Sequence, residues 1–295
     1  MSSSAPVFMP RFGSSSSLTA PSAFSPGLEN AAATVLARLR ACRWNMADGC
    51  TGITRELPAR EGEVLRSVPN SGAGPRREME MLNWVGVAEG GARGAALAPV
   101  MRRVNGHWCS DHRASNTWGF WCKRPPAMDE GQPLARNRMP YNVSDPHFVV
   151  MALSVPGSGH GGVAFQASKA EEDHAAELAL SNNRPQARWT DADGQRIVLT
   201  APDTLAPHQP AVITICSRPG AQSLRVNGRI VAEGEGTLGR GTFSQMLIGW
   251  GFRSFFPNEG FGGYVYGAIT GRGVPEPQEL ELLERYLGES AGILL

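Results

Sequence analysis

The sequence lacks a long hydrophobic run, any strong excess of charge and almost all lysine. No apolar run approaches the ~18–20 residues that a membrane-spanning helix needs. With 28 basic and 27 acidic residues the net charge is +1, so no global field attracts nucleic acid or an anionic membrane. Lys123 and Lys169 are the only lysines. The arginine excess fits a GC-rich coding bias or a use for planar, bidentate hydrogen bonding.

A secretory signal and a disulfide framework are missing as well. The N-terminus has no charged region followed by an apolar core, so we expect no signal peptide. The five cysteines are odd in number and show no CxxC spacing. This pattern predicts reduced thiols in a chain made in a cytosol. Whether Cys109 and Cys122 pair across strands stays open.

Turn residues and short strands dominate what the sequence does contain. Its 35 glycines and 22 prolines favour an all-β class. "HFVVMALSV" (147–155) and "PAVITICSR" (210–218) are typical of central strands. "SLRV-NG-RIVAEG" predicts a hairpin with Asn-Gly in a type I′ turn, and "ARWT-DADG-QRIVLT" predicts a second hairpin. Strands that recur every ~8–15 residues indicate a β-sandwich.

Helical patterns occur only near the two ends. Residues 28–47 predict a short helix that runs into a first strand. After Pro275 and Pro277, leucines at i, i+3 and i+7 predict a C-terminal helix with one apolar stripe, ending at Gly288. The stripe consists of Leu280, Leu283 and Leu287.

Residues 1–27 form a Ser/Pro-rich arm of a composition that is normally disordered. Spaced apolar anchors along it favour docking onto a partner surface, and folding back onto its own domain is the alternative. The docking residues are Phe8, Met9, Phe12 and Phe24. We expect one domain over residues 28–295 and a homo-oligomer.

Three segments together resemble the concanavalin A-like lectin/glucanase superfamily of laminin-G-like jelly rolls, in its bacterial and bacteriophage type. They are "AVITICSRPGAQSLRVNGRIVAEGEG", "FSQMLIGWG" and "GFGGYVYGAITGRGVPEPQELELLERYLG". The resemblance implies an all-β, antiparallel two-sheet jelly-roll sandwich closed by its last strand and a short C-terminal helix, behind an extended N-terminal arm.

The same resemblance implies a non-catalytic structural or attachment protein of a bacteriophage-like particle, as a head decoration, tail or baseplate component. Such a virion protein is assembled in the bacterial cytoplasm and contacts neighbouring subunits or host-surface polysaccharide. A free carbohydrate-binding lectin is the alternative, and a polysaccharide-acting glycosidase is a weaker one. We expect no nucleic acid partner and no membrane span.

Enzymatic and metal sites find little support. Glycosidases of this fold need two carboxylates ~5–5.5 Å apart, whereas Glu171, Glu172, Asp173 and Glu177 have the wrong spacing. Ser158 and His160 lie in a Gly-rich turn. His107, Cys109 and Asp111 would share one strand face, which is a possible metal-ligand spacing, but no distant residue clearly completes the set, so we expect ordinary packing. Some members of the superfamily bind calcium, but Gly267 replaces the usual acidic residue. We predict no cofactor, no metal and no enzyme.

Aromatic rings beside planar polar groups mark the candidate contacts for a glycan or partner. The loop "GWGFRSFFPNEGFGG" carries more apolar surface than a solvated turn needs, although its rings could instead plug the end of the core. The contact residues are Trp250, Phe252, Arg253, Phe255, Phe256 and Asn258 from this loop, with Trp108, Arg113 and Trp118 from earlier strands.

Overall fold

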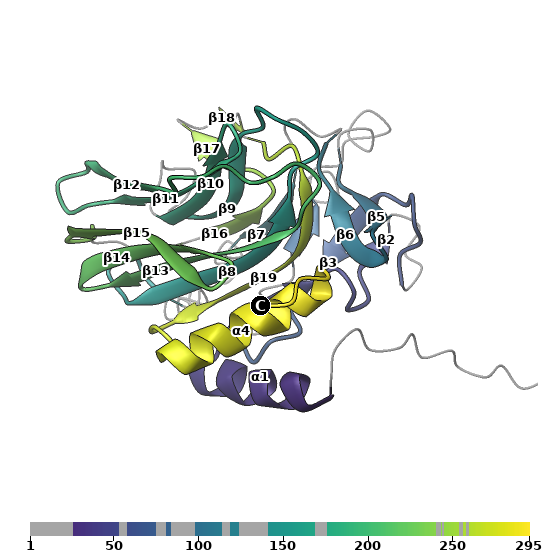
Figure 1. Cartoon of the computed structure of the whole chain (residues 1–295), viewed down its shortest axis with the longest axis horizontal. Helices are drawn as coiled ribbons and strands as arrows, with labels where there is room; N and C mark the ends of the chain where they lie inside the picture. Colours follow the sequence, from purple (N-terminus) through teal and green to yellow (C-terminus); the bar gives the residue numbers. More distant parts are fainter. Residues whose placement is uncertain are drawn as a thin grey trace, which may run out of the picture.

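The structure is a computed structural model. It describes residues 26–52, 58–74, 81–83, 98–113, 119–123, 141–168, 176–239, 243, 245–253, 256–257 and 260–295. Two antiparallel sheets pack face to face, and two helices lie below one of them (Figure 1). The predicted antiparallel sandwich with a C-terminal helix is confirmed.

The lower sheet in Figure 1 has eight strands in the order β15-β14-β13-β8-β19-β6-β5, with β1 also paired to β19. Their bounds are β1 (Cys42–Asn45), β5 (Val100–Val104), β6 (His107–Asp111), β8 (His147–Ser154), β13 (Ala211–Arg218), β14 (Gly220–Val226), β15 (Arg229–Gly236) and β19 (Tyr264–Arg272).

The upper sheet has nine strands in the order β12-β11-β10-β9-β16-β7-β4-β3-β2, and β17 and β18 form a separate hairpin. The bounds are β2 (Thr51–Gly52), β3 (Leu65–Val68), β4 (Met81–Asn83), β7 (Phe120–Lys123), β9 (Gly162–Ser168), β10 (Ala176–Ser181), β11 (Arg184–Thr190), β12 (Arg196–Thr200), β16 (Gln245–Ile248), β17 (Phe252–Arg253) and β18 (Phe256–Pro257).

Both predicted hairpins are present. β14 and β15 pair across Asn227 and Gly228, whose φ angles of 49° and 79° suit a type I′ turn. β11 and β12 pair across the turn that begins at Asp191. Its carboxylate accepts hydrogen bonds from the backbone N–H groups of Asp193 and Gln195, so it closes the turn.

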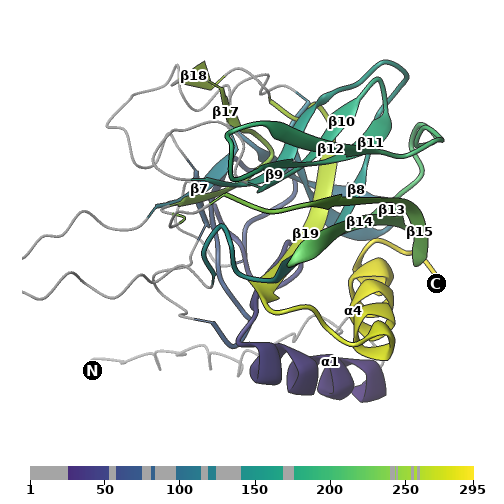
Figure 2. The ribbon, with the colours of Figure 1, turned by 90° about the vertical axis from the view of Figure 1, so that its left-hand side faces the viewer.

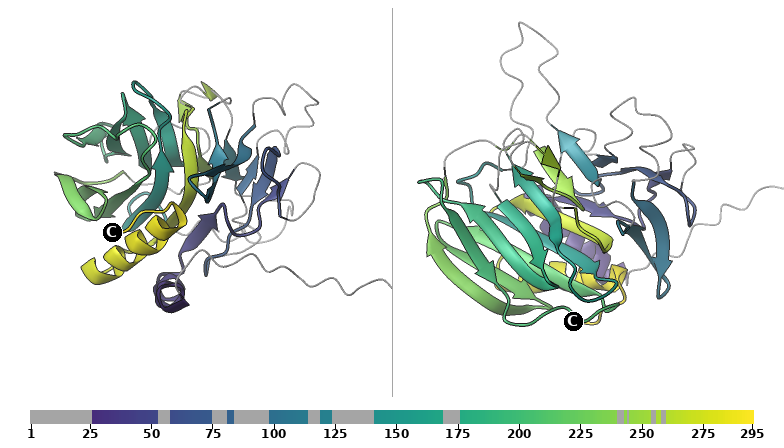
Figure 3. Two further views of the ribbon diagram at one scale, coloured as in Figure 1. Left: turned by 45° about the vertical axis from the view of Figure 1, so that its right-hand side comes forward. Right: turned by 90° about the horizontal axis from the view of Figure 1, so that it is seen from above.

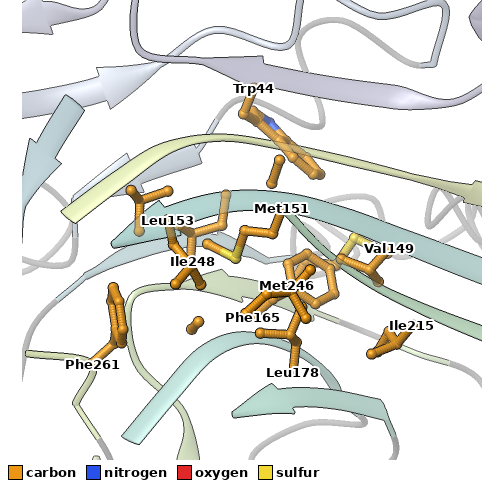
Figure 4. Close-up of a cluster of buried hydrophobic side chains, with 14 of the residues drawn as sticks. Trp44, Val149, Met151, Leu153, Phe165, Leu178, Ile215, Met246, Ile248 and Phe261 are labelled. Carbon is orange, nitrogen blue, oxygen red and sulfur yellow. The ribbon is translucent and has the colours of Figure 1, made fainter. Parts of the chain in front are cut away.

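The core fills the space between the sheets with buried apolar side chains from both (Figure 4). Val149 and Met151 come from the eight-stranded sheet, and Phe165, Leu178 and Met246 from the nine-stranded one. All five are fully buried. Removing this apolar surface from water is the main favourable term in the folding of the sandwich.

Helices α1 (Pro26–Leu39) and α4 (Pro277–Ser290) cover the outer face of the eight-stranded sheet (Figures 1 and 2). The predicted leucine stripe of α4 packs in a second apolar cluster with residues of α1 and of that sheet. Glu276 and Glu279 form a capping box at the N-terminus of α4. Gly288 does not end the helix as predicted. It lies inside α4, which runs to Ser290, because the next turn remains hydrogen-bonded to Gly288 and Glu289.

Arginines join the helices to the sheet and to each other. Arg225 forms two hydrogen bonds with the buried carboxylate of Glu284, at 2.8 and 3.1 Å. Arg43 bonds to Tyr286, and Arg38 pairs with Glu279 between the two helices. These contacts fix α4 against the hairpin β14–β15 and against β1.

The cysteines are buried thiols. Cys109 lies in the eight-stranded sheet and Cys122 in the nine-stranded sheet, so the pairing left open by the sequence is not formed. Burial raises the pKa of the Cys109 thiol to about 12, which removes its nucleophilic character at neutral pH. Among the described residues, no helix is long and apolar enough to cross a membrane.

Candidate functional site: the outer face of the nine-stranded sheet

The outer face of the nine-stranded sheet carries polar side chains, and neither of the two described helices covers it. Met246 and Ile248 of β16 point into the core, so Gln245 and Leu247 point outward by the alternation of a strand. Seen from above in Figure 3, the helices lie behind both sheets. The polar side chains of this face, here called the outer polar row, are Gln166, Ser168, Glu177, Gln186, Arg188, Arg196 and Gln245.

Glu177 of β10 is the centre of the outer polar row. Strand register places it beside Gln166 of β9 and beside Arg188 of β11. Gln166 Nε2 donates to Glu177 Oε1 at 2.7 Å. Nη1 of Arg188 and Nη2 of Arg196 each lie 3.5 Å from Glu177 Oε2. The carboxylate is therefore held by one amide and two guanidinium groups.

Side-chain exposure increases from Glu177 through Arg188 to Arg196. The side chain of Glu177 is 0% exposed, that of Arg188 is 12% exposed and that of Arg196 is 33% exposed. Taking a carboxylate out of water costs several kcal/mol unless cations and hydrogen bonds compensate it. The arginine pairs supply that compensation, and Arg196 opens the row to solvent.

A second set of hydrogen bonds fixes the other half of the row. Trp121 Nε1 donates to Gln245 Oε1 at 3.1 Å, and Gln245 Nε2 donates to Ser168 Oγ at 2.9 Å. Trp121, Leu247 and Trp250 form a small apolar cluster beside these bonds. Both ends of the Gln245 amide are thus oriented by neighbours on the same face.

The exposed end of the row is also ordered by its own contacts. Arg188 donates to Gln186 Oε1 from Nε at 3.1 Å and from Nη2 at 2.8 Å. Gln186 Nε2 donates to Thr200 Oγ1 at 3.1 Å. The accessible part of the row therefore consists of Gln186, Thr200 and Arg196, whose polar groups are positioned by the buried Glu177 and by Arg188 before any ligand arrives.

Trp250 does not contact the surface as predicted. Its side chain is 0% exposed and its Nε1 donates to the backbone oxygen of Phe120 at 2.9 Å. Phe261, at the end of the same loop, is buried in the core cluster. Phe261 therefore follows the alternative that the sequence allowed, in which rings of this loop plug the core, whereas Trp250 is buried in the outer-face cluster with Trp121 and Leu247.

The other predicted contact residues of that loop are only partly described. Phe252, Arg253 and Phe256 belong to the backbone hairpin β17–β18. Phe255, Asn258 and the earlier Trp118 lie outside the described residues. Their predicted contacts stay predictions.

Arg113 and Trp108 lie in and beside β6 of the other sheet, so the structure does not bring them to the outer polar row. Arg113 Nε and Nη2 donate to Asp111 at 2.9 and 2.8 Å, and its guanidinium lies 4.6 Å from the centre of the Tyr264 ring. Burial opposes ionisation of Asp111, but Arg113 and Arg102 hold the pKa of its carboxyl below the usual value. Arg103 stacks over Trp108 at 5.2 Å. Ligand contact by Arg113 and Trp108 stays a prediction.

The structure does not describe the N-terminal arm, but it does describe the residues considered for a metal site. Phe8, Met9, Phe12 and Phe24 lie outside the described residues, so docking onto a partner stays a prediction. Within the described ranges no group of three His, Cys, Asp or Glu side chains is placed to hold a metal ion. Asp111, from the considered strand-face set, instead binds arginine.

The sequence also missed a buried serine–histidine pair. Ser110 Oγ lies 2.9 Å from His112 Nε2, and both residues are 0% exposed. Burial lowers the pKa of His112 to about 4. Both side chains are fully buried, so this pair lies away from the outer polar row and from the surface of the sandwich.

A weak signal for the outer polar row was present in the sequence. Gln166 and Glu177 interrupt the apolar strands "GVAFQAS" and "AELALS". Polar residues inside such strands indicate either solvent exposure or a bonded network. Only the strand register showed which residues lie together.

Comparisons with known proteins give partial likenesses. No family model and no curated protein matches the chain. The carbohydrate-binding module CBM40 of the Ruminococcus gnavus IT-sialidase, bound to α2,3-sialyllactose, is 14% identical with a TM-score of 0.41; the match covers 48% of this chain and 82% of the module. Domain 4 of AbnA, a GH43 extracellular arabinanase from Geobacillus stearothermophilus in complex with arabinotriose, is 12% identical with a TM-score of 0.43, covering 63% and 81%.

A match to botulinum neurotoxin type C, whose cell entry depends on two ganglioside molecules, is 7% identical with a TM-score of 0.39; it covers 50% of this chain and 36% of the toxin chain. These likenesses are too distant to carry function. The function proposed next is argued from this chain's own residues.

Proposed function

We propose that this protein binds carbohydrate through the outer face of the nine-stranded sheet. The observation that carries the proposal is the fully buried, outward-facing carboxylate of Glu177, bonded to Gln166 and paired with Arg188 and Arg196. A charge buried on the face that points away from the core has a cost in stability and makes no core contact. Ligand recognition is a reason to hold it there.

The chemistry of this face suits sugar hydroxyl groups. Carboxylate, amide and guanidinium groups each offer two coplanar hydrogen-bonding atoms, which match neighbouring hydroxyl pairs. Arg196, Thr200 and Gln186 lie at the accessible end of the row. The bound sugar would form hydrogen bonds with these accessible side chains, and the more buried Glu177 and Arg188 would hold them in position.

The described partners of Glu177 favour binding over bond cleavage. They include an amide and two guanidinium groups; glycoside hydrolysis would in addition require a second carboxyl group that flanks the bond. Release of reducing sugar from a panel of polysaccharides, at a rate that Glu177→Gln abolishes, would show that the face is an active site instead.

A glycan array followed by calorimetry tests the proposal. The full chain should retain particular glycans, and Arg196→Ala should weaken binding of the best of them by about tenfold. Glu177→Gln, which keeps the side-chain shape, should weaken it at least as much. Glu233→Gln, on the free edge strand β15, is the matched control and should bind as the wild type does.

Two results would contradict the proposal. One is no retention of any glycan by a chain that melts cooperatively. The other is an affinity that survives both Arg196→Ala and Glu177→Gln, because those changes alter the accessible and the buried end of the same row.

A further inference from the structure

A pocket lies between the two sheets, beside the turn of the β14–β15 hairpin. Its volume is about 370 Å³, within the range of sites that hold small molecules. Two segments form its walls, residues 201–205 after β12 and residues 226–231 of the hairpin, with Pro185 from β11. None of the side chains of the outer polar row lines it.

The sheets are close together elsewhere along this side of the sandwich. A Cβ at Gly234 would lie 2.7 Å from Cδ2 of Leu199, and one at Gly236 would lie 2.3 Å from Cδ1 of Ile197. At Arg229 and Val231 of the same strand, the pocket takes the place of that close packing. The space is therefore local to one end of β15.

Backbone hydrogen bonds fix the wall formed by residues 201–205. Ala201 N–H donates to the backbone oxygen of Pro185 at 2.9 Å, and Leu205 N–H donates to that of Asn183 at 2.8 Å. Both ends of the segment are therefore tied to the β10–β11 hairpin.

The opposite wall is fixed from two sides. Asn227 N–H donates to the backbone oxygen of Val212, and Val212 N–H donates back to Asn227 Oδ1, both at 2.8 Å. Arg225, held by Glu284, donates to the backbone oxygen of Gly228 at 2.6 Å. A site with both walls tied in this way is preformed, so a ligand loses little free energy in ordering it.

The lining combines an apolar body with two opposite charges. Pro185, Leu205 and Val231 supply apolar surface, and Asp203 and Arg229 supply exposed charged groups. Neither Asp203 nor Arg229 forms an ion pair within the described part of the chain. A ligand that carries both an anion and a cation would satisfy both groups.

We propose that this pocket binds a small zwitterion with an apolar body, of the class of free aromatic or large aliphatic amino acids. Arg229 binds the carboxylate, Asp203 binds the ammonium group, and Leu205 and Val231 pack against the apolar body. The site is separate from the outer polar row, so it does not depend on the carbohydrate proposal.

Calorimetric titration of the full chain with L-phenylalanine tests this assignment, with two probes that each lack one charge. L-Phenylalaninamide lacks the carboxylate, and 3-phenylpropionate lacks the ammonium group. We expect saturable binding of L-phenylalanine and binding weaker by about tenfold or more for each probe.

Charge variants assign each probe to its residue. Arg229→Gln should weaken L-phenylalanine by about tenfold and leave L-phenylalaninamide unchanged, whereas Asp203→Asn should weaken L-phenylalanine and leave 3-phenylpropionate unchanged. Both side chains are exposed, so these variants are expected to fold. Glu233→Gln, on the same strand as Arg229 but outside the pocket, is the control and should bind all three probes as the wild type does.

No saturable binding of L-phenylalanine or L-leucine at millimolar concentration would overturn the proposal. Binding that neither Arg229→Gln nor Asp203→Asn weakens would also overturn it, because the ligand would then lie elsewhere.

Discussion

The two outer faces of the sandwich have opposite chemistry. α1 and α4 cover the outer face of the eight-stranded sheet, with buried apolar contacts among Leu36, Val150 and Leu283. The outer face of the nine-stranded sheet instead carries the outer polar row around Glu177. The comparison shows that one face is packed under helices, whereas the other holds the network of polar side chains for which we propose ligand binding.

The largest expected effect is a loss of folding stability at low pH, caused by two buried histidines. The properties of the two outer faces should therefore be compared near neutral pH. Burial lowers the pKa of His112 and of His147 from 6.5 to about 4. Between these pH values the unfolded chain binds more protons than the folded chain, so stability falls as pH falls. The two histidines together should cost about 5 kcal/mol of stability between pH 7 and pH 4.5.

Urea unfolding at pH 7 and at about pH 4.5 measures this loss. His147 is fixed as a neutral ring, because Nδ1 donates to the Asp145 backbone oxygen at 2.8 Å and Nε2 accepts from Trp189 Nε1 at 3.2 Å. A free energy of unfolding that stays level over this range would show that these rings are not buried as described.

Truncation under the helical layer should give the next largest effect. Leu283→Ala removes a fully buried side chain of α4 and should lower the free energy of unfolding by about 2–5 kcal/mol, without changing glycan affinity. Glu281→Ala, at an exposed position of the same helix, is the control and should stay within about 0.5 kcal/mol. Equal losses in both variants would mean that α4 is not packed on the sheet.

Glu177→Gln should affect glycan affinity more than stability, whereas Leu283→Ala should affect stability and leave affinity unchanged. Loss of the buried charge should lower stability by only about 1–3 kcal/mol, while glycan binding falls by tenfold or more. Denaturant unfolding and calorimetry on the same preparation separate the two quantities. A large loss of stability with unchanged affinity would assign the outer polar row a purely structural role.

Arg38→Ala should have the smallest effect. Its ion pair with Glu279 joins α1 to α4 at the surface, where Arg38 is 53% exposed. Solvent screens such pairs, so the variant should lose at most about 1 kcal/mol in denaturant unfolding. A larger loss would mean that α1 stabilises the covered face chiefly through this contact and not through its apolar side.

The sequence predicted what depends on local spacing. The Asn227–Gly228 turn, the leucine stripe of α4 and the central strands at β8 and β13 all follow from short patterns, and the structure confirms them. The sequence shows only that Glu177 lacks the carboxylate spacing of a glycosidase. It does not reveal the network around Glu177, because the partners come from β9, β11 and β12. Strand register brings these residues together, and no local pattern encodes it.

Trp250 is a second case in which local sequence does not predict the surroundings of a side chain. The aromatic loop indicates apolar surface, but composition does not say whether a ring is exposed or is buried against neighbouring side chains, as Trp250 is against Trp121 and Leu247. Here Gly119 allows the Trp250 ring to pack closely, since a Cβ at that glycine would lie 2.6 Å from Trp250 Cδ1. The contact that fixes the ring is thus with a residue far away in the sequence.

The most direct test of the account is a backbone-amide NMR titration of the chain with the glycan that it retains most strongly. We predict that shift changes gather on β10, β11 and β12 around Glu177 and Arg196, and that α1 and α4 stay unchanged. Shift changes confined to the helical layer or to the β5–β6 hairpin would contradict the claim that the outer face of the nine-stranded sheet is the binding face.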